Sequence, residues 1–221
     1  MKKPKVFIAC DTTSLTKVRR IIDHSKTNKI EIGFKFGLEF MNSKKGRQFV
    51  STLKGKIIFV DLKLNDTVNT MLSAVKALRD LKINYLTVHI SSGLTALKAV
   101  KKVSGKIKII GVTALTSLND NDLKLIGYNK SVKQLVAHQA RLAKKASLDA
   151  LVCSPYEVSM VRKIFKKEII TPGVQFRKKN YDQKRSMEAK SIKSDWLVIG
   201  RAVTRGNIKK NIQKLAKELI K

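Results

Sequence analysis

Eight short apolar runs alternate with longer amphipathic segments along the chain, and this alternation limits the possible folds more than any other feature. A short apolar run predicts a buried strand, and apolar residues spaced three and four apart predict a helix. The predicted strands are residues 6–9, 30–34, 57–60, 85–88, 107–112, 150–153, 169–171 and 196–199. The predicted helices are residues 14–25, 44–52, 68–81, 93–103, 132–146 and 157–165, a short helix within 185–193, and 208–219.

Strands that alternate with helices are typical of a parallel sheet. Eight such units in 221 residues, with no linker or break in composition, predict a single-domain (β/α)8 barrel over residues 1–221. The alternative is an open, doubly wound sheet, which usually carries a glycine-rich turn after its first strand. Residues 10–14 follow the first predicted strand and contain no glycine, so the barrel is favoured.

The chain is strongly basic, with 47 Lys and Arg residues against 16 Asp and Glu residues and a net charge of +31. The excess is spread over the whole length, and aromatic residues make up only 6%, too few for base-stacking platforms. We therefore expect a solvated lysine-rich surface that attracts phosphorylated anions, and no specific nucleic-acid partner. A basic nucleic-acid-binding protein is the alternative class, and it predicts salt-sensitive affinity.

No apolar run is long enough to span a bilayer, and residues 1–9 lack the apolar core of a signal peptide. These features predict a cytoplasmic protein without a membrane partner. Disulfides are rare in a reducing cytosol, so Cys10 and Cys153 are expected to be buried free thiols. The histidines have no metal-ligand spacing, and we expect no metal site and a core position for His89.

Charged residues follow the third predicted strand at once, at Asp61, Lys63 and Asp66. Alternate side chains of a strand share a face, so Asp61 and Lys63 are expected to point the same way. Such a cluster beside a buried strand is unfavourable unless it is paired, and it shifts the pKa values of its members. It is either a structural ion pair that caps the next helix or a catalytic proton donor between carboxylates.

Polar residues also follow most of the other predicted strands, and barrel enzymes carry their chemistry at these carboxyl ends. The residues are Asp11, Lys35, His89, Ser91, Ser92, Thr113, Thr116, Ser117, Pro172, Gly173, Gln175, Gly200 and Arg201. Gly200 permits close backbone approach to a ligand, and a helix start at Arg201 offers N–H groups to an anion. Because Arg201 can also bind phosphate oxygens, this last strand end predicts a phosphate site.

The pattern Asp61-x-Lys63-x-x-Asp66 resembles the DxKxxD signature of the orotidine 5′-phosphate decarboxylase suprafamily. Further segments resemble the family in the same order: residues 9–11 (A-L-D), 35–40 (K-x-G-x-x-x-F), 87–89 (T-V-H), 112–117 (V-T-x-L-T-S), 152–154 (V-C-S), 171–174 (T-P-G-I), 182–185 (D-Q-K-R) and 198–201 (V-I-G-R). The resemblance implies cofactor-free decarboxylation of orotidine 5′-phosphate to UMP in pyrimidine biosynthesis.

The resemblance also implies roles for individual residues. Lys63 would protonate C6 of the pyrimidine, Asp61 would lie beside the departing carboxylate, and Lys35 and Asp66 would complete an array of alternating charge. The implied substrate-binding residues are Asp11 and Lys35 for the ribose, Thr116 and Pro172 for the pyrimidine, and Gln183, Gly200 and Arg201 for the phosphate. A homodimer is implied, in which Asp66 and Thr67 reach the partner's site.

The DxKxxD element is shared with sugar-phosphate relatives, namely 3-keto-gulonate-6-phosphate decarboxylase and hexulose-phosphate synthase, which usually need magnesium. An enzyme of that type is therefore the alternative, although the L-T-S, T-P-G and D-Q-K-R segments resemble the orotidylate branch. Two features depart from that branch. Gln175 replaces the usual arginine, with Arg177 two residues on, and residues 186–189 shorten a family segment. Both concern the loop expected to close over the phosphate.

Overall fold

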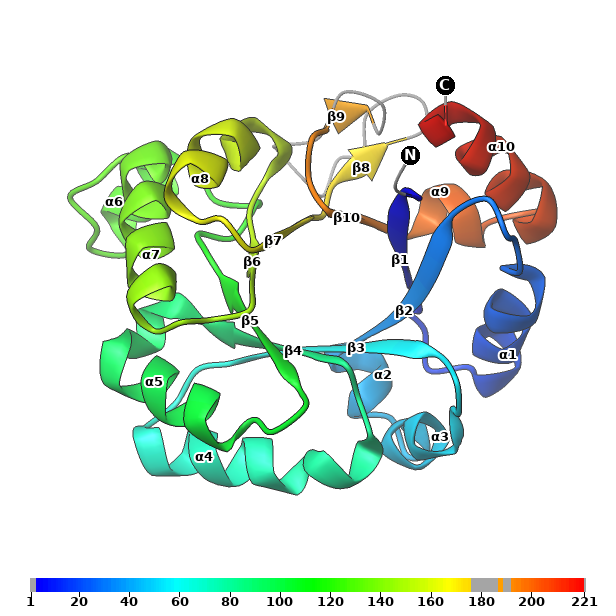
Figure 1. Ribbon diagram of the computed structural model, residues 1–221, viewed down its shortest axis with the longest axis horizontal. Coiled ribbons are helices and arrows are strands. Elements are labelled where there is room, and N and C mark those ends of the chain that lie inside the picture. Colours follow the sequence, from blue (N-terminus) through cyan, green and yellow to red (C-terminus); the bar gives the residue numbers. More distant parts are fainter. Residues whose placement is uncertain (1–2, 176–186, 189–191, 221) are drawn as a thin grey trace.

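Eight parallel strands close into a barrel in the computed structural model, which describes residues 3–175, 187–188 and 192–220 (Figure 1). Around the barrel the strand order is β1-β10-β7-β6-β5-β4-β3-β2. The strands are β1 (Lys5–Ala9), β2 (Glu31–Gly37), β3 (Ile57–Leu64), β4 (Tyr85–His89), β5 (Lys108–Val112), β6 (Ala150–Val152), β7 (Glu168–Thr171) and β10 (Trp196–Ile199). The predicted (β/α)8 barrel is confirmed, and the closed sheet excludes the open doubly wound alternative.

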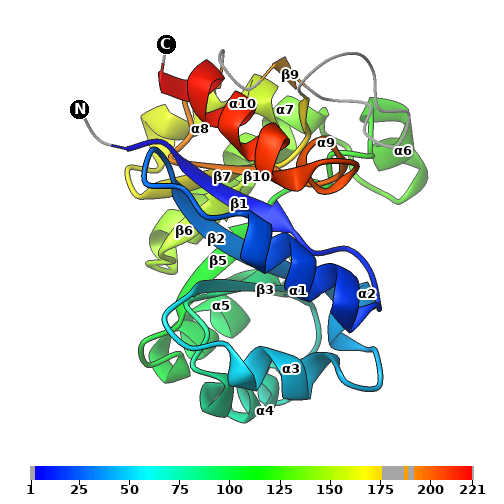
Figure 2. The ribbon, with the colours of Figure 1, turned by 90° about the vertical axis from the view of Figure 1, so that its right-hand side faces the viewer.

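The helices surround the barrel and cover the outer face of the sheet (Figures 1 and 2). They are α1 (Leu15–His24), α2 (Leu38–Met41), α3 (Gly46–Thr52), α4 (Val68–Ala77), α5 (Gly93–Val103), α6 (Asp120–Leu125), α7 (Val132–Lys145), α8 (Val158–Ile164), α9 (Arg201–Thr204) and α10 (Ile208–Ile220), with 3-10 turns η1 (Arg79–Leu81), η2 (Ile90–Ser92) and η3 (Pro155–Glu157). None of the helices within the described ranges has the length and apolar character needed to cross a membrane.

A small two-stranded sheet pairs β8 (Val174–Gln175) with β9 (Met187–Glu188). The helix predicted within residues 185–193 is therefore wrong at Met187–Glu188, where the backbone pairs with β8 instead of turning. Residues 185–186 and 189–191 of that prediction lie outside the described residues.

Caps in the sequence explain where the longer helices begin. Ser14 precedes α1, and its side chain accepts a hydrogen bond from the backbone N–H of Lys17. Ser131 and Gln134 form a reciprocal capping box at the start of α7. Caps of this kind satisfy backbone donors that have no partner within the helix. Helix α7 then packs one apolar stripe onto the barrel, at Val132, Leu135, Val136, Ala140 and Ala143.

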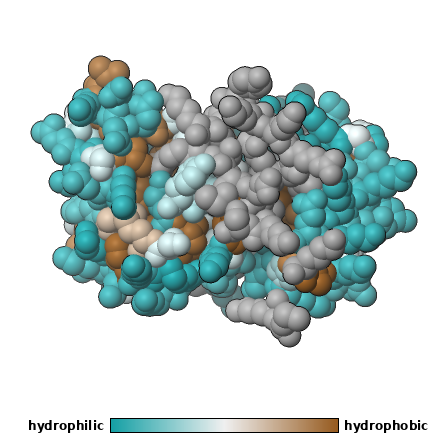
Figure 3. Space-filling view, turned by 90° about the horizontal axis from the view of Figure 1, so that it is seen from above, coloured by the Kyte–Doolittle hydropathy of each residue, from teal (hydrophilic) through white to brown (hydrophobic). Residues whose placement is uncertain are grey.

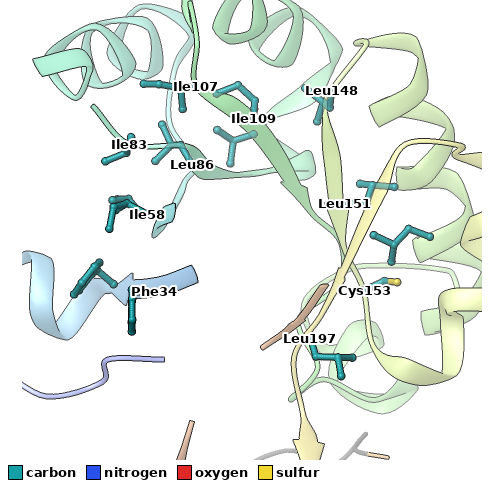
Figure 4. Close-up of a cluster of buried hydrophobic side chains, with 14 of the residues drawn as sticks. Phe34, Ile58, Ile83, Leu86, Ile107, Ile109, Leu148, Leu151, Cys153 and Leu197 are labelled. Carbon is teal, nitrogen blue, oxygen red and sulfur yellow. The ribbon is translucent and has the colours of Figure 1, made fainter. Parts of the chain in front are cut away.

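The hydrophobic core has an outer and an inner part. The outer part lies between the sheet and the helices, and Figure 4 shows a section of it. The inner part fills the barrel with Phe7, Phe59, Tyr85, Ile110, Ala150, Ile170 and Trp196. The rings of Phe7 and Trp196 stack with centroids 4.0 Å apart. Because these aromatic side chains occupy the interior, space for a ligand is left toward the carboxyl ends of the strands.

Both cysteines are buried thiols that form no disulfide, as predicted. Burial raises the pKa of the Cys10 thiol to about 12, so this group stays protonated and unreactive at neutral pH. Outside the core, the face of the molecule in Figure 3 carries mostly hydrophilic side chains on its described surface, as expected for a lysine-rich chain.

Candidate active site

A cavity of about 300 Å³ opens at the carboxyl ends of the barrel strands. Nine of the predicted site and strand-end residues line it: Asp11, Lys35, Asp61, Lys63, Thr116, Pro172, Gly173, Gly200 and Arg201. They follow or belong to six different strands, so the closed barrel brings together residues that are distant in sequence. The charged residues Asp11, Lys35, Asp61, Lys63 and Arg201 therefore converge on one mouth, as predicted, whereas the strand-end candidates His89, Ser91, Ser92, Thr113 and Ser117 do not line this cavity.

Four charged side chains form an alternating row in this cavity. The Nζ atom of Lys35 lies 2.8 Å from Oδ1 of Asp11 and 3.7 Å from Oδ2 of Asp61. The Nζ atom of Lys63 donates to the same Oδ2 of Asp61 at 2.8 Å. The side chains of Lys35 and Asp61 are only 11% and 13% exposed, so each depends on its oppositely charged neighbours in place of water.

The charges in this row reinforce one another. Burial favours a protonated Asp61 carboxyl, but the ammonium groups of Lys35 and Lys63 outweigh burial and hold its pKa below the ordinary value. Burial also opposes a charged Lys35, but the carboxylates of Asp61 and Asp11 raise its pKa above the ordinary value. Asp61 and Lys35 are therefore both ionised at neutral pH.

Strand β3 is irregular where it carries the catalytic candidates. Its pairing with β4 shifts between Val60 and Leu64, and Lys63 adopts a φ of 49°. A positive φ is uncommon for a residue with a side chain and costs about 1–2 kcal/mol. Backbone strain of this kind often marks functional sites, because the surrounding structure must hold the residue in place.

Thr87 of β4 supplies that support. Its hydroxyl accepts a hydrogen bond from the backbone N–H of Lys63 at 2.9 Å and donates one to Oδ1 of Asp61 at 2.9 Å. The residue is fully buried. From the sequence, Thr87 is recognisable only as part of the segment at residues 87–89 that resembles the family, and no role is predicted for it. The available signal was a polar residue in the middle of the apolar run at residues 85–88.

Gly37, at the end of β2, is a second residue without a predicted role. A Cβ atom added there would lie 3.3 Å from Nζ of Lys35 and 3.5 Å from Oδ1 of Asp11. Any side chain would therefore crowd the Lys35–Asp11 ion pair. The position of Gly37 in the K-x-G segment was the feature of the sequence that could have indicated a role. Its closeness to the ion pair depends on the fold and could not be predicted.

His89 ends β4 and is half-buried, so its predicted place in the core is wrong. His89 is the last residue of β4 and does not line the cavity described above. Burial and the ammonium group of Lys63 lower the pKa of His89, against a smaller opposing effect of Asp61. His89 is therefore neutral at pH 7.

Asp66 and Thr67 lie outside this cavity on an exposed turn before α4. Oδ1 of Asp66 accepts a hydrogen bond from the backbone N–H of Thr67 at 2.6 Å. Among the described residues, Lys63 forms an ion pair with Asp61 and none with Asp66. Within one chain the predicted array therefore contains Lys35, Asp61 and Lys63 but lacks its fourth member.

The predicted phosphate residues fall into two groups. Gly200 and the exposed Arg201 line the cavity, with α9 beginning at Arg201. A Cβ atom at Gly200 would meet other protein atoms only at 3.6 Å or more, so the absence of a side chain leaves free space there. Gln183, Arg177 and the shortened segment that begins at Ser186 fall outside the described residues, apart from the backbone of Met187–Glu188.

Metal-ligating side chains do not gather in the described part of the chain: it has no group of three His, Cys, Asp or Glu residues that could hold a metal ion. The charged cavity is thus built from lysine, aspartate and arginine side chains. This arrangement can bind an anionic ligand and offer a proton from an ammonium group.

Comparisons with known proteins agree with one another. The family model "Orotidine 5'-phosphate decarboxylase / HUMPS family" matches residues 4–214. An orotidine 5′-phosphate decarboxylase of Wolbachia pipientis is 38% identical over 208 residues, which cover 90% of this chain and 91% of the relative. One of Coxiella burnetii is 36% identical over 215 residues, covering 91% and 90%.

Solved structures resemble the chain over nearly its full length. A crystal structure of orotidine 5′-phosphate decarboxylase from Lactobacillus acidophilus superposes with a TM-score of 0.84 at 27% identity and covers 99% of both chains. The enzyme from Methanocaldococcus jannaschii, complexed with the inhibitor BMP, gives a TM-score of 0.80 at 22% identity and covers 100% of both chains. This second likeness concerns the fold alone.

Proposed function

Because the chain belongs to the Orotidine 5'-phosphate decarboxylase / HUMPS family, we propose that it converts orotidine 5′-phosphate to UMP and CO2. The reaction is a step of pyrimidine biosynthesis, and we place it in one domain of residues 1–221 in the cytoplasm. The observation that carries the proposal is the buried row of Lys35, Asp61 and Lys63 at the mouth of the barrel. The named relatives, at 36–38% identity, support this substrate over a sugar phosphate.

In the proposed reaction, the bond between C6 and the carboxylate carbon breaks and its electron pair stays on C6. The carboxylate leaves as CO2, and C6 takes a proton from the ammonium group of Lys63. Lys63 then regains a proton from solvent. The ammonium group also stabilises the negative charge that develops on C6, and preorganised charge of this kind is usually the largest contribution to catalysis.

Asp61 has two parts in this mechanism. Its carboxylate holds the Lys63 ammonium group in place through the 2.8 Å hydrogen bond. It would also lie beside the substrate carboxylate, where like charges about 4 Å apart repel by roughly 4 kcal/mol at an effective dielectric constant near 20. That repulsion ends when CO2 leaves. The lowered pKa of Asp61 supports this part, because a protonated carboxyl would not repel the substrate.

The remaining cavity residues would bind the rest of the nucleotide. Asp11 and Lys35 would hydrogen-bond the ribose hydroxyls. Thr116 would bind the pyrimidine, with Pro172 against the ring, and Gly200, Arg201 and Gln183 would hold the phosphate. The cavity of about 300 Å³ lies at the small end of the range for ligand sites, which suits a mononucleotide. Binding of the remote phosphate would help to assemble the site around C6.

We also propose a homodimer in which Asp66 and Thr67 enter the partner's site. The exposed position of Asp66 and its separation from Lys63 within one chain support this arrangement. Mixing two inactive variants, Lys63→Ala and Asp66→Ala, tests it. Hybrid dimers would contain one site with both native residues, so mixing should restore activity. A mixture as inactive as its components would contradict the shared site.

The reaction is tested by following the loss of orotidine 5′-phosphate absorbance, with and without a metal chelator. We expect turnover that the chelator does not change, and no conversion of hexulose or keto-gulonate phosphates. Magnesium-dependent conversion of a sugar phosphate, with no turnover of orotidine 5′-phosphate, would favour the other branch of the family. Binding to RNA without either activity would favour the nucleic-acid alternative.

A further inference from the structure

A second cavity, of about 380 Å³, adjoins the proposed active site. The two cavities share Ala9, Asp11, Gly200 and Arg201 in their walls. The second one extends away from the barrel mouth, between α1 and the turn that joins α9 to α10. These three helices lie on the same side of the barrel in both ribbon views (Figures 1 and 2).

The second cavity is unusually rich in arginine. Four cationic residues line it: Lys17 and Arg20 of α1, and Arg201 and Arg205 at the two ends of α9. The chain has only ten arginines, so three of them in one cavity are not explained by the lysine-rich surface. Arginine differs from lysine in its planar fork of N–H donors, which fits phosphate oxygens in pairs.

Local structure gathers these side chains around the cavity. Gly206 has a φ of 69°, which permits a tight turn directly after Arg205. The guanidinium of Arg20 donates to the carbonyl oxygen of Gly206 at 3.5 Å and so links α1 to this turn. Asp11 is the one acidic residue among the described residues that line the cavity, and its Oδ1 is paired with Lys35 at 2.8 Å. The cavity is therefore positively charged overall.

We propose that this cavity binds the outer phosphates of a nucleoside di- or triphosphate. The inference rests on the proposed function in one respect: the base and the innermost phosphate would occupy the first cavity. A monophosphate would end at Gly200 and Arg201, which belong to both cavities. Further phosphates would continue from there toward Lys17, Arg20 and Arg205. A nucleotide without a carboxylate at C6 cannot lose CO2, so it binds as a competitive inhibitor.

The test compares UMP, UDP and UTP as inhibitors of orotidine 5′-phosphate turnover, without magnesium and at one fixed ionic strength. The wild-type enzyme should bind UTP at least about tenfold more tightly than UMP. One additional charge-assisted contact to an outer phosphate contributes about this much affinity. Lys17→Gln and Arg205→Gln should each weaken UTP binding several-fold, with UMP binding and kcat unchanged. Lys98→Gln is the matched control, because it removes the same charge from an exposed position on α5.

Two results would overturn the subsite: equal affinity for UMP and UTP, or an equal effect of Arg205→Gln and Lys98→Gln. Calorimetry with inorganic tripolyphosphate separates this inference from the proposed function, since it needs no base. Tripolyphosphate binding that is weakened by Arg205→Gln but not by Lys98→Gln supports the cavity even if UMP does not compete. Failure of UMP to compete would contradict the proposed function alone.

Discussion

Replacement of Thr87 by valine tests whether one buried hydroxyl holds Lys63, the proposed proton donor, in its strained position. The change keeps the shape of the side chain and removes both hydrogen bonds, one from the backbone N–H of Lys63 and one to Oδ1 of Asp61. An unsatisfied buried N–H costs about 1–3 kcal/mol, and a hydrogen bond to a charged group contributes about 1.5–3 kcal/mol. With partial relaxation we expect the free energy of unfolding to fall by about 2–4 kcal/mol.

The same change should lower kcat about 10- to 100-fold, which corresponds to an increase of about 1.4–2.8 kcal/mol in the activation free energy. The reason is that the Lys63 ammonium group, no longer held in position, would protonate C6 less often. KM should change little, since Thr87 does not line the cavity proposed to bind the nucleotide. The hydrogen bond from Thr87 also contributes to the lowered pKa of Asp61. Its loss should raise that pKa, so the acid limb of the kcat profile should move to higher pH.

Two further variants separate positioning from stability. Thr87→Ser keeps the hydroxyl and should retain most of the activity. Thr113→Val removes another buried hydroxyl, which donates to the carbonyl oxygen of Val152 at 2.8 Å, and Thr113 does not line the cavity. It should destabilise the fold but leave kcat and its pH profile unchanged. A Thr87→Val enzyme with wild-type kcat and wild-type pH profile would refute the positioning argument.

Four other substitutions test neighbouring parts of the structure. Lys63→Ala should reduce kcat by about 10²- to 10⁴-fold or more without unfolding the protein, and near-normal CO2 release would contradict its role as proton donor. Arg201→Ala should weaken UMP binding about 10- to 100-fold, as measured by calorimetry, with unchanged affinity arguing against the phosphate site. Asp61→Asn leaves a buried ammonium group short of a partner and should cost about 3–5 kcal/mol in urea unfolding at pH 7. Since folding lowers the pKa of Asp61, its stabilisation is present at neutral pH and is lost as the pH falls through the folded-state pKa, so this difference should shrink in acid; a constant difference would contradict the ion-pair argument. Phe7→Ala should destabilise the barrel by about 3–5 kcal/mol through a cavity in its aromatic interior, and a smaller loss in thermal unfolding would show that the interior collapses around the change.

The barrel could be predicted from the sequence because apolar periodicity repeats in every strand–helix unit. Strand ends were less predictable. The strand predicted at residues 57–60 was expected to end before the first charged residue, Asp61, but β3 continues to Leu64. The carboxylate of Asp61 forms ion pairs with the ammonium groups of Lys35 and Lys63, so these charges did not end the strand. The short helices α2 and α6 were also missed as elements, because four and six residues give too little periodicity.

The candidate site was predictable as a set of residues but not as a geometry. Polar residues after apolar runs identified Asp11, Lys35, Asp61 and Lys63, and the barrel topology places them at one mouth. The role of Thr87 depends on which strand lies beside β3 and in which register, and this information is not local. The position of Asp66 depends on a second chain in the proposal, so no pattern within one sequence could fix it.

The irregularity of β3 gives a physical reason for the close spacing of Asp61 and Lys63. In a regular strand, residues two apart project from the same face but start about 6.6 Å apart. The register shift and the positive φ of Lys63 change the direction of its side chain, and its ammonium group lies 2.8 Å from Asp61. The strain of about 1–2 kcal/mol is offset by the Thr87 hydrogen bonds and the ion pair. The strained residue is thus also the proposed proton donor, and its position depends on contacts from both β3 and β4.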